Sequence, residues 1–217
     1  MVGYLGDATS KILLSADEKT RVVVYIVLST IRMRVIRGVI MGKCGTGKTT
    51  FLMHARDAHS CSEIAPTIGV DNVTIPYESV TLRCWDTSGH ARFKEIIPMF
   101  VRKADVAIYV FDTSDSESIE EAIRWYRFAG CQPEPPAVNV FLGNVRRGTP
   151  DLKKYAFPSP HVYTASAIEN YDVDYVFRSI LELCVESPPT APDSAFSLHM
   201  LRPKQTRTRE CTCCNIS

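Results

Sequence analysis

A glycine-rich loop ending in lysine and threonine is the stretch of this sequence that points most directly to chemistry. Residues 42–49 read Gly-Lys-Cys-Gly-Thr-Gly-Lys-Thr, the spacing G-x-x-x-x-G-K-T of a phosphate-binding loop, or P-loop. The glycines let backbone N–H groups curl around a phosphate, and a following helix adds the positive end of its dipole. We expect Lys48 to reach the β and γ phosphates and the Thr49 hydroxyl to bind the Mg²⁺ that bridges them.

Three later positions extend the loop into a nucleotide site. Thr67 lies in a polar loop, where its hydroxyl is expected to complete the Mg²⁺ shell and touch the γ phosphate. Asp86 closes a strand-like run and is expected to hold the metal through water, with the Gly89 N–H meeting the γ phosphate. The backbone of Ser166 and Ala167, after the last short strand, is expected to meet the base. Ligands sit at the carboxyl ends of such strands, so these positions should converge.

The elements that position these residues alternate between strands and helices. Predicted strands cover residues 35–41, 72–76, 79–85, 106–111, 138–142 and 161–164. Predicted helices cover residues 51–56, 92–100, a stretch ending near 129, and 173–184. The third helix has two candidate capping boxes, Ser114 to Glu117 and Ser118 to Glu121. This order predicts a three-layer α/β P-loop fold, with a mostly parallel six-stranded sheet and helices on both faces.

Composition narrows the class further. The 217 residues are 45% hydrophobic with a net charge of +1, so a sizeable core is expected and no global field favours nucleic acid as a partner. Eight cysteines are spread over loop, strand, helix and C-terminus, which favours a reduced chain over a disulfide framework. A zinc site at the terminal Cys-Thr-Cys-Cys lacks a second ligand pair.

The two ends of the chain differ from its centre. Residues 1–33 form an N-terminal extension of unknown role, whose apolar run at 22–28 is too short to span a membrane and poor as a secretory signal. It is an added strand, a short helix, or sequence upstream of a true start at Met33. Residues 34–186 form the predicted nucleotide-binding domain. Residues 187–217 lack periodicity and are rich in Pro, Ser, Thr and Arg, which predicts a disordered tail.

The sequence resembles the Ras superfamily of small GTPases, most closely its Rab branch, over about residues 34–186. The residues that carry this resemblance are Gly42 to Thr49, Pro66-Thr67-Ile68-Gly69-Val70-Asp71, Trp85-Asp86-Thr87, Gly89, Arg92-Phe93 and Gly143-Asn144. The resemblance implies a GTP/GDP switch with Mg²⁺, whose loops near Thr67 and His90 are ordered by the γ phosphate and relax after hydrolysis. It also implies effectors that bind those two loops, an exchange factor and an activating protein.

The resemblance assigns roles to individual residues. Nucleotide contacts are expected from Gly42, Lys43, Cys44, Gly45, Thr46, Gly47, Lys48, Thr49, Thr50, Asp86, Asn144, Ser166 and Ala167. Metal contacts are expected from Thr49, Thr67 and Asp86, and catalytic contacts from His90, Thr67 and Gly89.

Several positions depart from the family pattern. His90 replaces the glutamine that orients the attacking water, and Cys44 crowds the place an arginine finger would enter, so slow hydrolysis is expected. The guanine-reading Asn-Lys-x-Asp becomes residues 144–147, Asn-Val-Arg-Arg. Because arginine cannot accept hydrogen bonds, we expect weak or relaxed base selectivity. Ile168 stands at the lysine of Ser-Ala-Lys, and the segment between Asn144 and Ser166 looks too short for a full helix.

The chain ends Cys213-Cys214-Asn215-Ile216-Ser217, which fits a C-a-a-X prenylation motif and resembles the double-cysteine ending of Rab proteins. Lipid on Cys213 and Cys214, added by the prenylation machinery, would anchor the protein to the cytoplasmic face of an intracellular membrane, with a cytosolic pool. A solvated, unmodified basic tail is the alternative.

Three functions remain open from the sequence. The first is a prenylated, Rab-like GTPase switch in vesicle trafficking, with slow turnover. The second is a pseudo-GTPase of the same fold, serving as a membrane-anchored interaction platform that does not cycle. The third, an ATP-using P-loop enzyme, has no support beyond the P-loop.

Overall fold

The computed structural model describes residues 34–57, 65–77, 80–146 and 152–187. Their six-stranded sheet has the order β2-β3-β1-β4-β5-β6. The strands are β1 (Arg34–Met41), β2 (Val70–Pro76), β3 (Val80–Thr87), β4 (Val106–Asp112), β5 (Val138–Asn144) and β6 (Val162–Ala165). The β1–β4, β4–β5 and β5–β6 pairs are parallel, and β2–β3 is antiparallel. The predicted mostly parallel sheet is confirmed.

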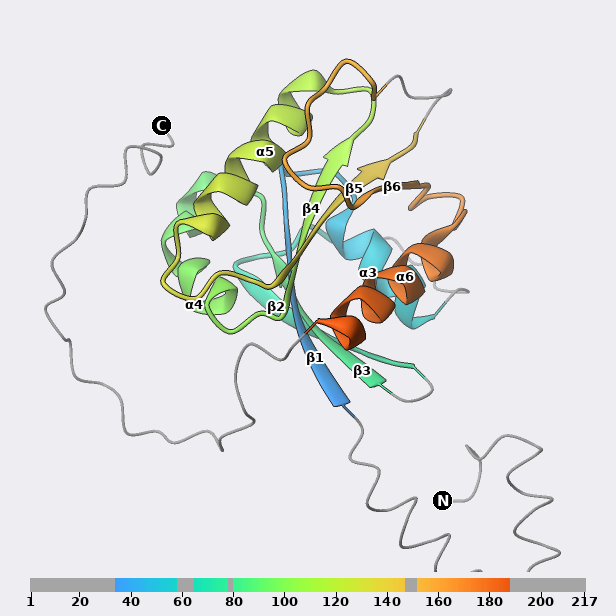
Figure 1. The fold of residues 1–217 in the computed structure, drawn as a ribbon. Helices are drawn as coiled ribbons and strands as arrows, with labels where there is room; N and C mark the ends of the chain where they lie inside the picture. The colour runs from blue at the N-terminus through green and yellow to red at the C-terminus, as the bar shows by residue number, and fades with distance from the viewer. Residues whose placement is uncertain (1–33, 58–64, 78–79, 147–151, 188–217) are drawn as a thin grey trace, which may run out of the picture. The chain divides into compact units, whose positions relative to one another are not determined.

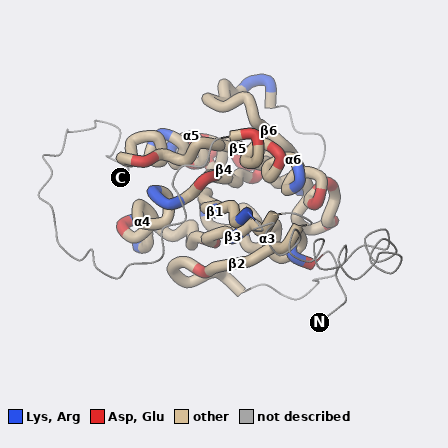
Figure 2. The backbone as a smooth tube through the Cα atoms, turned by 60° about the horizontal axis from the view of Figure 1, so that its bottom comes forward, with Lys and Arg blue, Asp and Glu red and all other residues tan. Residues whose placement is uncertain are grey.

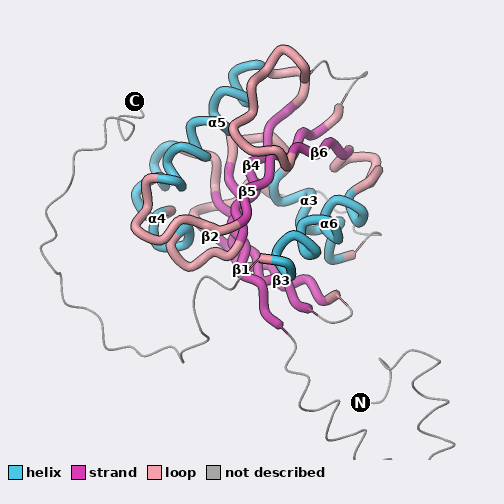
Figure 3. The backbone as a smooth tube through the Cα atoms, viewed as in Figure 1, coloured by secondary structure: helices cyan, strands magenta, loops and turns pink. Residues whose placement is uncertain are grey.

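Helices cover both faces of this sheet (Figures 1 and 3). The helices α3 (Lys48–Arg56) and α6 (Val173–Glu186) pack on one face, and α4 (Pro98–Val101) and α5 (Ser116–Gly130) on the other. The predicted stripe of α6 is buried, namely Val173, Val176, Phe177, Ile180, Leu181 and Cys184. In β3, Val80, Leu82 and Cys84 are buried as their alternation predicts.

The predicted helix over residues 92–100 is wrong. The chain instead forms the 3₁₀ helix η1 (Ala91–Ile96), followed by the separate short helix α4, which begins at Pro98. Proline has no N–H to donate to a preceding turn and suits the first turn of a new helix. Pro98 therefore divides the segment into two pieces.

Neither predicted capping box starts α5. Its N-cap is Asp115, whose side chain accepts a hydrogen bond from the Glu117 N–H at 3.0 Å. Ser114 donates instead to Asp112, at 2.6 Å from Oγ to Oδ1. Ser118 is buried inside the helix, and its Oγ donates to the Asp115 carbonyl at 2.7 Å. Both serines are used to hold the end of β4 against α5, so the aspartate between them caps the helix.

Charged residues of both signs are interspersed along the described chain (Figure 2), consistent with the near-zero net charge. Among the described cysteines, Cys44, Cys84, Cys131 and Cys184 are not in disulfides. In the described stretches none of the helices could cross a bilayer, judged by length and hydropathy. Between β5 and β6, residues 145–146 and 152–161 contain no helix, which agrees with the expected shortening. The terminal regions 1–33 and 188–217, including the prenylation motif, lie outside the described residues.

Candidate nucleotide-binding site

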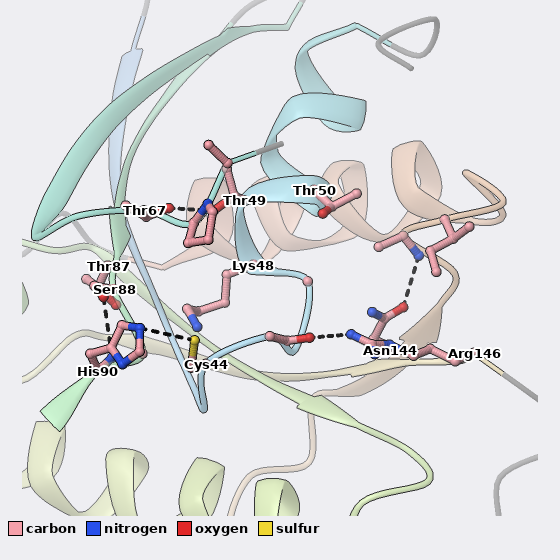
Figure 4. A pocket seen from close by; sticks show the side chains of 17 residues that line it. Cys44, Lys48, Thr49, Thr50, Thr67, Thr87, Ser88, His90, Asn144 and Arg146 are labelled. Carbon is pink, nitrogen blue, oxygen red and sulfur yellow. Dashed lines mark hydrogen bonds between the residues drawn. The ribbon is translucent and has the colours of Figure 1, made fainter. Parts of the chain in front are cut away.

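A pocket opens at the carboxyl edge of the sheet, where the loop after β1 meets the ends of β3, β5 and β6 (Figure 4). Most predicted site residues line it: Cys44, Gly45, Gly47, Lys48, Thr49, Thr50, Thr67, Gly89, His90, Asn144 and Ala167. The other predicted residues are not among those that line it: Gly42, Lys43, Thr46, Asp86 and Ser166. In Figure 4, His90 lies on one side of Lys48 and Asn144 and Arg146 on the other, with Cys44 next to the Lys48 ammonium.

Lys48, Thr49, Thr67 and Asp86 form what we call the phosphate end of the pocket. The Lys48 ammonium is buried and donates to the carbonyls of Gly42 and Lys43, at 2.9 and 2.8 Å. These bonds hold it at the centre of the P-loop. Burial lowers the pKa of Lys48, an effect that nearby Asp86 opposes. An anion in the loop would favour the charged ammonium in the same way.

Three oxygens from three separate segments converge at this end. The Thr49 and Thr67 hydroxyls are 2.7 Å apart, and they donate to Asp86 Oδ2 at 2.6 and 2.8 Å. Thr49 belongs to α3, Thr67 to the loop before β2, and Asp86 to the end of β3. The predicted metal-binding residues are therefore brought together.

This cluster fits Mg²⁺. Asp86 Oδ1 is buried without a hydrogen-bond partner, and burial raises the pKa of Asp86. A cation would relieve both costs. Neighbouring oxygens around an octahedral Mg²⁺ with bonds of about 2.0–2.1 Å are about 2.9 Å apart, close to the 2.7 Å between the Thr49 and Thr67 hydroxyls.

The loop after β3 packs closely against the P-loop. A Cβ at Gly89 would lie 2.3 Å from the Cys44 backbone nitrogen, so only glycine fits there. Beside it, His90 Nε2 is 3.6 Å from Cys44 Sγ. Both side chains are exposed at the rim of the pocket. The imidazole thus faces the P-loop thiol, where water or a phosphate could reach both.

Asn144, Arg146, Ala167 and Ile168 form what we call the base end of the pocket. Buried Asn144, which is expected to contact the nucleotide, lines the pocket, and its amide joins two loops. Its Nδ2 donates to the Thr46 carbonyl at 2.9 Å, and its Oδ1 accepts the Ala167 N–H at 3.1 Å. In this structure the Ala167 N–H, which is expected to meet the base, donates to Asn144.

Arg146 is a site residue that the sequence did not single out for a role. Its Nε lies 3.1 Å from Asp112 Oδ2 at the end of β4, and its Nη2 donates to the carbonyl of Gly45 in the P-loop. The side chain is 39% exposed and lines the pocket. The sequence offered one signal for this contact, which is Asp112 at the end of a strand. A carboxylate there attracts a cation from the loop that follows the neighbouring strand.

The side chain of Lys43 is engaged outside the pocket. Its ammonium turns away from the pocket to Asp115 Oδ2 at 2.9 Å and Glu117 Oε2 at 2.5 Å. The hydrogen bond from Lys43 holds the pKa of Asp115 below its usual value. Lys43 contributes to the site by attaching the P-loop to α5, since its side chain is engaged there.

A P-loop between a buried strand and a helix, with a lysine at its centre and an oxygen cluster for Mg²⁺ beside it, defines a P-loop nucleotide-binding protein. Comparison with known proteins narrows the class. The model of the Ras family matches residues 37–147.

Known relatives are similar to the protein over most of the chain. The chain is 33% identical to the GTP-binding protein yptV5 of Volvox carteri over 171 residues, 70% of this chain and 83% of the relative. It is 27% identical to the Ras-related protein Rab-7B of Dictyostelium discoideum over 198 residues, 83% of this chain and 98% of the relative. It is 27% identical to Rab-5A of the same organism, over 72% of this chain and 84% of the relative. The chain belongs to the Ras family of small GTPases, and it is Rab-like.

Proposed function

We propose that this protein is a GTP/GDP switch in intracellular vesicle trafficking, anchored by lipid to the cytoplasmic face of a membrane and exchanging with a cytosolic pool. The observation that carries the proposal is the contact among Thr49, Thr67 and Asp86. It joins the P-loop, the loop at residues 65–69 and the end of β3, so a ligand at this point acts on all three segments.

Different residues of the chain would bind the metal, the phosphates and the effectors. Mg²⁺ held by Thr49, Thr67 and, through water, Asp86 would neutralise charge between the β and γ phosphates. Lys48 stabilises the same phosphates from the centre of the P-loop. Thr67 and Gly89 lie on the two loops that the γ phosphate would order, and effectors would bind those loops in their ordered form. An exchange factor and an activating protein would set the balance of the two states.

Hydrolysis is proposed to be slow. Water attacks the γ phosphate of GTP and yields GDP and inorganic phosphate, and its rate depends on how that water is oriented. His90 stands where the family has glutamine, and its Nε2 is 3.6 Å from Cys44 Sγ. An imidazole that faces the thiol is poorly placed to orient the water. Cys44 also narrows the approach for an arginine supplied by an activating protein.

The membrane anchor is proposed from the terminal motif. Geranylgeranyl or farnesyl groups on Cys213 and Cys214 would supply it, because two chains hold a protein far longer than one. Mass spectrometry of the protein purified from cells should find both thiols prenylated. Unmodified Cys213 and Cys214 in the membrane-associated protein would contradict this anchor.

Two measurements on the purified full chain test the switch. After denaturation, chromatography should find guanine nucleotide bound to the protein. Single-turnover assays with Mg²⁺ should then show GTP converted to GDP slowly. A chain that carries no nucleotide and binds neither GTP nor GDP would instead be a scaffold that does not cycle. Ordinary turnover would contradict the role assigned to His90 and leave the switch in place.

A further inference from the structure

At the base end of the pocket, free hydrogen-bond donors outnumber free side-chain acceptors. The inference drawn from this rests on the proposed binding of a nucleotide. With phosphates at Lys48, the base lies toward Asn144 and Arg146, on the other side of that lysine (Figure 4). Three acceptors on this side already receive hydrogen bonds. Arg146 donates to the Gly45 carbonyl, Asn144 donates to the Thr46 carbonyl, and Ala167 donates to Asn144 Oδ1.

The nearest carboxylate is engaged as well. Asp112 Oδ1 accepts from the Ser114 N–H and hydroxyl, at 2.9 and 2.6 Å, and Oδ2 lies 3.1 Å from Arg146 Nε. The Asp112 side chain is only 12% exposed. Among the described residues that line this end, no side chain offers an acceptor that is still without a donor, because Asn144 Oδ1 already receives the Ala167 N–H. Guanine's N1–H and 2-amino group need acceptors, so this end is poorly suited to read them.

Donors remain available at the same place. A guanidinium has five N–H groups in a planar fork. The contacts to Asp112 and Gly45 use Nε and Nη2, and no contact within the described residues involves Nη1. Those two contacts also hold the plane of the guanidinium in place at the rim. Ile168, 71% exposed and lining the same pocket, offers an apolar surface for the face of a base.

We infer that Arg146 is a specificity-determining residue that donates to the O6 and N7 acceptors of the base, so the pocket selects 6-oxopurine nucleotides without reading the 2-amino group. Arginine pairs with guanine through O6 and N7 in many nucleic-acid complexes. Hypoxanthine presents the same two acceptors and lacks only the 2-amino group. Adenine places an amino group where O6 would be, so it opposes a donor with a donor.

The test is competition by natural and altered nucleotides on the purified full chain. Release of fluorescent methylanthraniloyl-GDP is measured with GDP, IDP, ADP and 7-deaza-GDP as competitors in Mg²⁺. IDP should compete within about threefold of GDP. ADP and 7-deaza-GDP, which lose O6 and N7 respectively, should be weaker by about 10- to 100-fold, the change that one hydrogen bond to a charged group brings.

The Arg146→Ala variant tests whether Arg146 recognises the base or only supports the P-loop. Loss of support alone would weaken GDP, IDP and ADP by one common factor. Loss of base reading would instead reduce the preference for GDP over ADP to within about threefold. Arg124→Ala is the matched control, since Arg124 is a surface arginine of α5 that pairs with Glu120 at 3.9 Å. It should preserve the preference of the parent chain. A thermal melt of each variant confirms that it is folded.

Two results would overturn this inference and leave the proposed switch standing. The first is IDP binding at least 100-fold more weakly than GDP, which would mean that the 2-amino group is read. The second is an unchanged preference for GDP over ADP in folded Arg146→Ala. A chain that binds none of these nucleotides would overturn the proposed function together with the inference.

Discussion

At the phosphate end of the pocket, the side chains that would hold the ligand are buried or half-buried. Thr49, Thr67 and Asp86 are bonded to one another, and Lys48 is bonded to P-loop carbonyls. At the base end, Arg146 and Ile168 reach the surface, and the buried amide of Asn144 joins two loops. The phosphate end has residues that match the family at each position, whereas the base end has lost the lysine and aspartate of its motif. From this difference we expect phosphate binding and base recognition to be separable in this protein.

The largest expected effect breaks the phosphate end. Lys48→Ala removes a buried ammonium that would donate to two phosphates, and hydrogen bonds to charged groups contribute about 1.5–3 kcal/mol each. GDP affinity measured by fluorescence competition should fall about 10²- to 10⁴-fold. The preference for GDP over ADP among the remaining weak binding should persist, because the base end is intact. Lys153→Ala, at an exposed lysine, is the control and should leave affinity unchanged.

Metal removal should also act on the phosphate end alone. Because Thr49, Thr67 and Asp86 would hold Mg²⁺ together with the phosphates, chelation by EDTA should weaken GDP binding by about 5- to 150-fold, the usual range for coupled sites. The ratio of GDP to ADP affinity should stay the same. A ratio that changes with Mg²⁺ would show that the two ends are coupled and would contradict their separation.

His90→Gln sharpens the comparison by changing catalysis while leaving both ends intact. Glutamine would orient the attacking water as in the family, and a misplacement of about 1 Å can cost about 10²-fold in rate. Single-turnover GTP hydrolysis should therefore accelerate by up to about 10²-fold, with GDP affinity unchanged. Cys44→Ala, made separately, shows whether the thiol 3.6 Å away matters on its own. If neither variant hydrolyses GTP faster than the parent, neither residue limits hydrolysis and the explanation proposed for slow turnover is wrong.

The smallest expected effect lies at the base end. Asp112→Asn keeps a hydrogen-bond acceptor beside Arg146 but removes the negative charge that orients the guanidinium. Ion pairs that reach solvent contribute about 0.2–1 kcal/mol, so the preference for GDP over ADP should fall by about two- to fivefold. The same competition assay measures it. A larger loss, equal for both nucleotides, would mean that Asp112 supports the P-loop more than it positions Arg146.

Much of the fold could be predicted from the sequence because it depends on local patterns. The buried alternation of Val80, Leu82 and Cys84 and the stripe on α6 both follow from periodicity. Where the predicted helix boundaries were wrong, a neighbouring residue set the helix start instead of the predicted one. Asp115 capped α5 in place of two serines, and Pro98 divided a helix that the polar pattern suggested.

By itself, the sequence determined which residues form the phosphate end, because residues 42–49 and Asp86 belong to short motifs at strand ends. Only the tertiary structure decided what lies at the base end. Arg146 reaches Gly45 across 101 positions of sequence, and Asn144 reaches Thr46 across 98. No local pattern encodes such partners, since parallel strands bring together loops that are distant in the chain. The partner of a long polar side chain is therefore chosen by the fold.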